Sequence, residues 1–218
     1  MLLLQDARGG ISDMSIKSHF STSAVLVLIL GLAAVVAVIS VPPLLYSTTK
    51  VDSFAQAEAL ADQYLTGASS DLKIKEIMEF SNNFYVRVEE RSTGINAFEV
   101  LVDRYTGRAM PEPGPNMMWN TKYGMMSGMM GGMMGTSRGT ATADMPVTAQ
   151  NASRYAQEWL DLNDHGAKVA DPDTFYGYYT IDVSKDGSTY GMLSVNGYSG
   201  SVWYHTWHGK FIETMEYN

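Results

Sequence analysis

Cysteine is absent from all 218 residues of the sequence. Its absence excludes disulfide frameworks, thiolate metal sites and thiol nucleophiles, and it leaves the redox compartment open because any compartment tolerates such a chain. Charge is also scarce: charged residues make up 17% of the chain, the net charge is -8, and no block of lysine or arginine occurs. Nucleic-acid binding requires a basic surface, so we expect no DNA or RNA partner.

Catalytic motifs are missing as well. The sequence has no H-E-x-x-H, no G-x-S-x-G, no P-loop and no G-x-G-x-x-G after a predicted strand. Adjacent acids such as Glu89 and Glu90 fall beside predicted strand turns, which is typical of a solvated surface. We therefore predict that the protein is not an enzyme, although 45% apolar residues are enough for a folded core.

One long uncharged run, AVLVLILGLAAVVAVISVPPLLY, occupies residues 24–46. Its length meets the roughly 20 residues that a helix needs to cross a bilayer. Arg8 and Lys17 precede the run, which favours a cytoplasmic N-terminus. We expect residues 1–23 to be a cytoplasmic tail and 24–46 a single anchor in the cell membrane, with the rest of the chain extracytoplasmic. A cleaved signal peptide and a start at Met14 are the alternatives.

The chain after this run is built twice. QAEALADQYL (residues 56–65) matches NASRYAQEWL (residues 151–160), and in both segments apolar residues recur with the spacing of a helix packed on one side. Ser53 and Gln56 form a capping box at the first helix start, and glycines at 67 and 166 follow the helices.

Each predicted helix is followed by β-sequence. Apolar and polar residues alternate in NNFYVRVEERSTGINAFEVLVDRYTGRAM and in FYGYYTIDVSKDGSTYGMLSVNGYSGSVW, which can be aligned on VDRYTG and VNGYSG. Alternation and turn dipeptides such as Asp186-Gly187 predict antiparallel hairpins. WNTKYG from Trp119 and WHGKFI from Trp207 share a pattern, so we expect each unit to close with an equivalent last strand.

A helix followed by strands that end in V-D-x-x-T-G-x, as in FEVLVDRYTGRAM, resembles the PepSY family of small extracytoplasmic modules. The resemblance implies an α+β fold with one helix packed on a small antiparallel sheet in each of two units, at residues 53–124 and 148–213. It also implies binding or inhibition of a neighbouring membrane or extracytoplasmic protein, and it supplies no shared catalytic residues.

Between the two units, residues 125–147 form a linker rich in methionine and glycine. Eight methionines occur within eighteen residues: Met117, Met118, Met125, Met126, Met129, Met130, Met133 and Met134. Thioethers are soft, neutral ligands that suit Cu(I), and glycine spacers would let several of them surround one ion. Contact with an apolar protein or membrane surface and a passive linker are the alternatives.

Two histidines are candidate helper ligands. His205 and His208 lie three residues apart in WYHTWHG, and imidazole is a common copper ligand. A regular strand would send them to opposite faces, which favours a structural or exposed role unless the chain bends here. The leading hypothesis is an anchored accessory protein that binds or senses Cu(I). A PepSY-type protein-binding module, acting as a protease regulator or as an accessory subunit, is the alternative.

Overall fold

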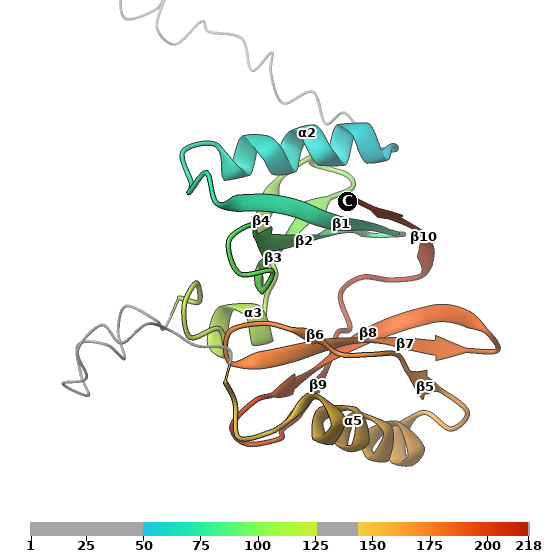
Figure 1. Cartoon of the computed structure of the whole chain (residues 1–218). Coiled ribbons are helices and arrows are strands. Elements are labelled where there is room, and N and C mark those ends of the chain that lie inside the picture. The colour runs from blue at the N-terminus through green and yellow to red at the C-terminus, as the bar shows by residue number, and fades with distance from the viewer. Residues whose placement is uncertain (1–49, 126–143, 218) are drawn as a thin grey trace, which may run out of the picture. The chain divides into compact units, whose positions relative to one another are not determined.

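A computed structural model describes residues 50–125 and 144–217 of the chain (Figure 1). The described residues form helices and antiparallel strands, which confirms the mixed α+β class. The helices are α2 (Phe54–Leu65), α3 (Pro115–Met118) and α5 (Ala149–Asn163). The strands are β1 (Leu72–Phe80), β2 (Asn83–Glu90), β3 (Asn96–Asp103), β4 (Ala109–Pro111), β5 (Lys168–Val169), β6 (Asp173–Thr174), β7 (Tyr178–Lys185), β8 (Ser188–Asn196), β9 (Val202–Tyr204) and β10 (Phe211–Glu216).

The helix α2 begins where its capping residues predict, and α5 begins at an equivalent cap. The Ser53 hydroxyl accepts a hydrogen bond from the Gln56 backbone N–H at 3.4 Å, and the Gln56 side chain accepts one from the Asp52 N–H at 2.9 Å. The Thr148 hydroxyl caps α5 in the same way, through the Asn151 N–H at 3.3 Å. These bonds satisfy amide groups that a helix start leaves without intrahelical partners.

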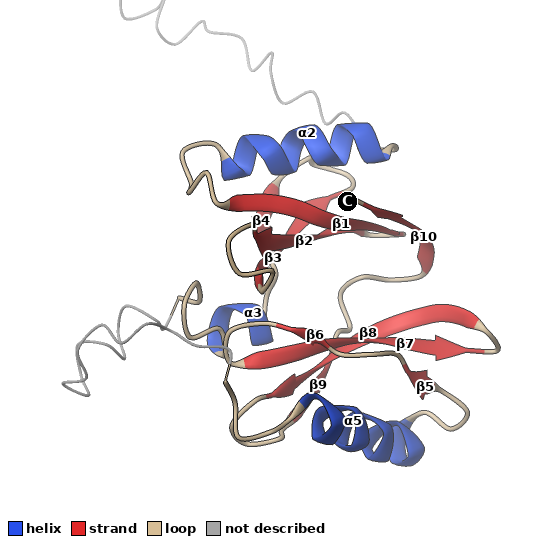
Figure 2. Cartoon of the chain, in the orientation of Figure 1, coloured by secondary structure: helices blue, strands red, loops and turns tan. Residues whose placement is uncertain are grey.

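The helices and sheets are stacked in four layers: α2, a first sheet, a second sheet and α5 (Figure 2). The first sheet has the strand order β10-β1-β2-β3-β4, and the second has β5-β7-β8-β9 with β6 paired to β7. Thr48–Asn218 form one compact unit, so the two repeats are packed together. A helix covers one face of each sheet, and the other face of each sheet is turned toward the other repeat.

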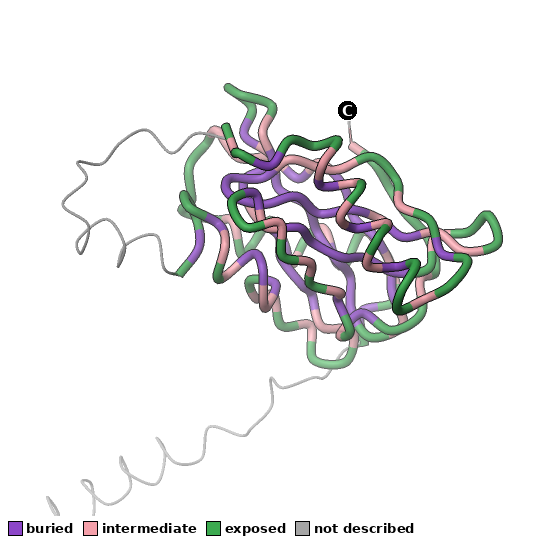
Figure 3. Tube along the Cα trace, turned by 90° about the horizontal axis from the view of Figure 1, so that it is seen from below, coloured by how far each residue is buried: buried purple, intermediate pink, exposed green. Residues whose placement is uncertain are grey.

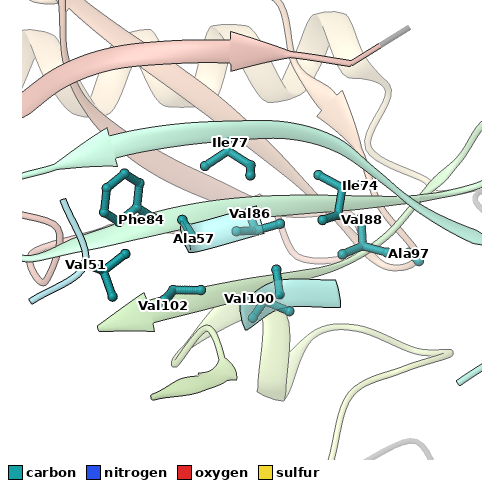
Figure 4. Packing of buried hydrophobic residues seen from close by; sticks show 11 residues of the cluster. Val51, Ala57, Ile74, Ile77, Phe84, Val86, Val88, Ala97, Val100 and Val102 are labelled. Atoms are coloured by element: carbon teal, nitrogen blue, oxygen red, sulfur yellow. The ribbon is translucent and has the colours of Figure 1, made fainter. Parts of the chain in front are cut away.

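The central strands are buried on both faces (Figure 3). In β2, Phe84, Val86 and Val88 pack with Ala57 of α2 in the apolar cluster of Figure 4. Arg87 lies between Val86 and Val88 in the sequence and therefore points to the opposite face of β2. It forms an ion pair there with Asp173 of β6, which belongs to the second sheet. This alternation follows from the two-residue period of a strand, and it directs the polar residues to the layer between the sheets.

The two aligned turns share the same hydrogen bonds. Asp103 accepts backbone hydrogen bonds from Tyr105 and Thr106 at 3.0 and 2.8 Å. Asn196, its counterpart, accepts the same bonds from Tyr198 and Ser199, both at 2.9 Å. Each turn ends in a glycine with positive φ, +66° at 107 and +74° at 200, which other residues rarely adopt.

The predicted closing strands were wrong. Residues 119–124 form turns rather than a strand. Residues 211–216 form β10, but β10 pairs with β1 of the first sheet, with Ile77 opposite Met215. The second repeat therefore donates its last strand to the first, and residues 205–210 are the crossover between the sheets.

Within residues 50–125 and 144–217, no helix is both long and apolar enough to cross a bilayer. The predicted tail at 1–23 and the predicted membrane-spanning segment at 24–46 lie outside the described residues.

Candidate metal centre

Two histidines and one glutamate meet in the layer between the sheets. Glu112 directly follows β4, His205 directly follows β9, and His208 lies in the crossover to β10. Their ligand atoms all lie within 4.8 Å of one another, and the exposed fractions of the residues are 0%, 4% and 2%. The chain bends after β9, so the odd spacing of the histidines no longer sends their rings to opposite faces.

Hydrogen bonds on the far side of each ring fix its orientation. His208 Nδ1 lies 3.0 Å from Asn83 Oδ1, and the Asn83 amide donates to the Trp207 carbonyl at 3.2 Å. Because that bond uses the amide nitrogen, the Asn83 oxygen must accept from His208 Nδ1–H. The proton on Nδ1 leaves the Nε2 atom of a neutral His208 ring with a lone pair on the side of Glu112.

His205 is oriented by a chain of hydroxyls. His205 Nε2 lies 3.0 Å from the Ser194 hydroxyl, which lies 3.1 Å from the hydroxyl of Thr180. The Thr180 hydroxyl donates to Glu99 Oε1 at 2.6 Å. A consistent direction along the chain makes His205 Nε2–H the donor to Ser194, which leaves Nδ1 as the free ligand atom toward Glu112.

The facing atoms of Glu112 and the two histidines lie at ion-pair distance. His205 Nδ1 and His208 Nε2 lie 3.3 and 3.0 Å from Glu112 Oε1. Both nitrogens and Glu112 Oε2 are buried without a hydrogen-bond partner among the described residues. Glu112 Oε1 already accepts from the Trp207 indole at 2.9 Å. Buried donors and acceptors are rarely left unpaired, and either a proton on one imidazole or a bound metal ion would satisfy these atoms.

The electrostatics of the site favour an ionised Glu112. Burial raises the pKa of Glu112, but the charge and contacts of His205 and His208 outweigh it and hold that pKa well below its usual value. Burial lowers the pKa of His208 and favours its neutral ring. Burial and the charge of Glu112 raise the pKa of Glu99 well above its usual value. The pKa of Glu112 is therefore lowered by the same two histidines that face it.

Aromatic rings enclose both imidazoles. The ring of His208 stacks on Phe80 with centroids 4.4 Å apart, and the ring of His205 stacks on Trp207 at 4.7 Å. Tyr85 meets His208 edge-on at 5.9 Å. Such packing restricts ring rotation and excludes water, which preorganises the nitrogens as ligands.

The distances of 3.3 and 3.0 Å from Glu112 Oε1 to the two imidazole nitrogens are compatible with ligands of one metal ion as well as with an ion pair. Two ligands that lie about 2.0–2.1 Å from a tetrahedral ion are roughly 3.3 Å apart. Two imidazoles and a carboxylate suit divalent ions such as Cu²⁺ and Zn²⁺. The three residues can therefore hold such an ion and leave at least one coordination position for another ligand.

A second buried glutamate shows how this chain satisfies a carboxylate without a metal. Glu90 accepts hydrogen bonds from Lys122, Tyr123, Tyr176 and Thr93 at 2.5 to 2.8 Å. Burial alone would raise its pKa, but these hydrogen bonds lower it to about 2. The interpretation of Glu90 as a solvated surface residue was wrong, because it is 1% exposed and joins the two repeats.

The structure brings together only part of the predicted ligand set. His205 and His208 meet, but in the company of Glu112, which the sequence did not indicate. Met118 and Met125 are exposed, and Met117 is partly buried near the C-terminal end of α3. The other predicted ligands lie outside the described residues: Met126, Met129, Met130, Met133 and Met134.

No protein-family model matches the chain, and the search of curated proteins found no match. Among solved structures, the chain is similar to the Bacillus megaterium YpeB C-terminal domain, with a TM-score of 0.25 and 10% sequence identity. The match covers 70% of this chain and 61% of that one, so the chain spans less than two thirds of its length. These values are too low to assign a family or a function.

Proposed function

We propose that this protein is a membrane-anchored, extracytoplasmic copper-handling protein with a buried metal centre formed by Glu112, His205 and His208. The observation that supports the proposal is the buried group formed by Glu112, His205 and His208, whose ligand atoms all lie within 4.8 Å of one another. The role is binding or sensing rather than catalysis.

Copper is the metal that both candidate sites share. The histidine and carboxylate donors suit Cu²⁺, while the thioethers of Met117, Met118 and the six methionines from Met125 to Met134 suit Cu(I). An extracytoplasmic protein meets copper in both oxidation states. We therefore assign Cu²⁺ to the buried centre and Cu(I) to the methionine-rich segment.

Competition titrations of the full-length protein test this assignment. A His205→Gln/His208→Gln variant is expected to lose tight Cu²⁺ binding and to keep Cu(I) binding. A variant with all eight methionines changed to leucine is expected to show the opposite pattern. His165→Gln is the matched control, because His165 is exposed in the turn after α5. Equal Cu²⁺ retention by the wild type and the double histidine variant would exclude the buried centre.

A PepSY-type protein-binding module is the second candidate function. It is supported by the repeated helix-and-sheet unit and by β10, an edge strand in which Ile212 and Met215 are 50% and 38% exposed. An exposed edge can accept a partner strand. A photo-crosslinker placed at Ile212 is expected to give one discrete adduct in membranes, whereas the same group at the exposed Lys168 gives none. Identical patterns at both positions would count against the partner.

A further inference from the structure

Among the edges of the two described sheets, the edge formed by β10 is the longest (Figure 1). β4 and β9 have three residues each, and β5 and β6 have two each. Prolines lie at two of these short edges, Pro111 in β4 and Pro172 directly before β6. β10 has six residues and contains no proline or lysine. Short strands, prolines and lysines protect sheet edges, so β10 is the edge best able to accept another strand.

The backbone of β10 offers hydrogen-bonding groups on its outer side. Directly after β10, the Tyr217 N–H donates to the Lys75 carbonyl of β1 at 2.9 Å. Residues that bond to the neighbouring strand alternate with residues that do not, so the N–H and C=O groups of Thr214 and Glu216 turn away from β1. An added strand can pair with these groups.

The charge of β10 favours a basic strand on that side. The register places Glu216 opposite Glu76 and Glu213 opposite Glu79. Each β1 glutamate has an arginine as its ion-pair partner, whereas the two β10 glutamates form no ion pair within residues 50–125 and 144–217. Like charges that face each other directly weaken the pairing of strands, and basic side chains on the other side of β10 would offset this effect. A second copy of β10 would instead add further glutamates.

We propose that β10 is the docking edge for an extended segment of a partner protein in which two basic residues lie three positions apart. The inference rests on the protein-binding function given above as the second candidate, and it adds the chemistry of the partner. In an antiparallel pairing the basic residues lie opposite Glu216 and Glu213. Apolar residues lie opposite the exposed side chains of Met215 and Ile212. The partner segment therefore reads basic-apolar-x-basic-apolar, with the basic residues on opposite faces of the enlarged sheet.

The probe is a fluorescent peptide with the core Lys-Val-Thr-Lys-Val, titrated with the full-length protein and followed by anisotropy. The same peptide with glutamate in place of both lysines is expected to bind at least about tenfold more weakly, the effect of two exposed ion pairs. N-methylation of the peptide threonine, whose N–H faces Thr214, is expected to abolish binding. N-methylation of the first valine, opposite Met215, is expected to leave binding unchanged because that N–H faces away from β10.

Charge reversal in the protein provides the second test. Glu213→Lys/Glu216→Lys is expected to bind the glutamate peptide more tightly than the lysine peptide. The new lysines would face the β1 glutamates, so β10 is expected to stay paired with β1. Glu158→Lys/Asp161→Lys is the matched control with the same change in charge, because both residues are exposed on α5, which packs on the other sheet. It should keep the preference of the wild type.

The outcomes separate this inference from the proposed function. Equal affinities of the wild type for the lysine and glutamate peptides would overturn the inference, as would binding that survives N-methylation of the threonine. Cross-links between two copies of the chain at Ile212 would also overturn it and would assign the edge to self-association. If the peptides show the expected preferences but a photo-crosslinker at Ile212 finds no partner in membranes, the chemistry of the edge holds and the second candidate function fails.

Discussion

Replacing Glu112 with glutamine is expected to lower the affinity of the full-length protein for Cu²⁺ by more than about a hundredfold, because a direct ligand contributes more than the outer-shell partners, whose loss costs 10- to 100-fold. The substitution keeps the size of the side chain and the acceptor for the Trp207 indole. It removes the one carboxylate that faces both imidazoles. Equilibrium competition with a chelator measures the change.

Stability of the same variant without metal distinguishes a metal centre from a buried ion pair. In a metal centre the glutamine amide can donate to a free imidazole nitrogen, so the metal-free variant should unfold at the same or a higher urea concentration. If Glu112 instead paired with a protonated imidazole, the substitution would leave that charge buried and cost about 3 to 5 kcal/mol. Glu99→Gln is the matched control, because Glu99 is the neighbouring fully buried carboxyl. Its effect on Cu²⁺ affinity should stay within about 10- to 100-fold, the range of an outer-shell change.

Glu76→Gln is expected to remove part of the pH dependence of stability between pH 4.5 and 7; burial also raises the pKa of Asp182, to about 6, and Asp182 contributes to the rest. The pKa of Glu76 is raised to about 7, and burial is the largest cause. The charge of Arg87 opposes this shift, whereas the charges of Asp182 and Glu216 add to it. Below its usual pKa of 4.5 the group is neutral in both states. As the pH rises toward 7, the unfolded chain loses this proton before the folded chain does. The free energy of unfolding therefore falls by roughly 2 to 3 kcal/mol.

Urea unfolding at pH 5 and pH 8 measures this effect. All four tryptophans lie between residues 119 and 207, so their fluorescence follows the unfolding of the described part of the chain. The wild type should be less stable at pH 8 than at pH 5, and Glu76→Gln should be more stable than the wild type at pH 8. Glu213→Gln, an exposed substitution on β10, should leave the difference unchanged. An unchanged pH dependence in Glu76→Gln would show that another group causes it.

Local features of the fold could be predicted because local contacts determine them. The capping residues Ser53 and Gln56 and the apolar spacing located α2, and the aligned VDRYTG and VNGYSG segments located two equivalent turns. Asp103 and Asn196 differ in charge but offer the same side-chain oxygen to the same two amides. Because the two side chains accept the same hydrogen bonds, the turn keeps its geometry whether the position holds aspartate or asparagine.

The pairing of β10 could not be predicted in this way. The shared pattern at Trp119 and Trp207 suggested equivalent closing strands, but pairing depends on which sheet edge is free after the chain has crossed over. β10 lies beside β1, with the register Glu76 to Glu216, more than a hundred residues away along the chain. Amphipathic alternation specifies which face of a strand is buried but not which strand is its neighbour.

The candidate site was half predictable for the same reason. His205 and His208 stand together in the sequence and are chemically distinctive. Glu112 lies in MPEPG, a proline-containing segment with no ligand spacing to either histidine, and only the crossover brings it between them. The sequence does contain a signal for a polar layer. Alternation in β2, β3, β7 and β8 places polar residues such as Glu99, Thr180 and Ser194 on one face of each strand. An isolated sheet would expose that face to water.

Anomalous diffraction from crystals of the copper-loaded full-length protein tests the central claim most directly. The metal centre predicts a copper peak about 2.0–2.2 Å from the Glu112 carboxylate, His205 Nδ1 and His208 Nε2. A protein whose only copper peaks lie among methionine sulfurs, with no ion between Glu112 and the two histidines, would contradict it.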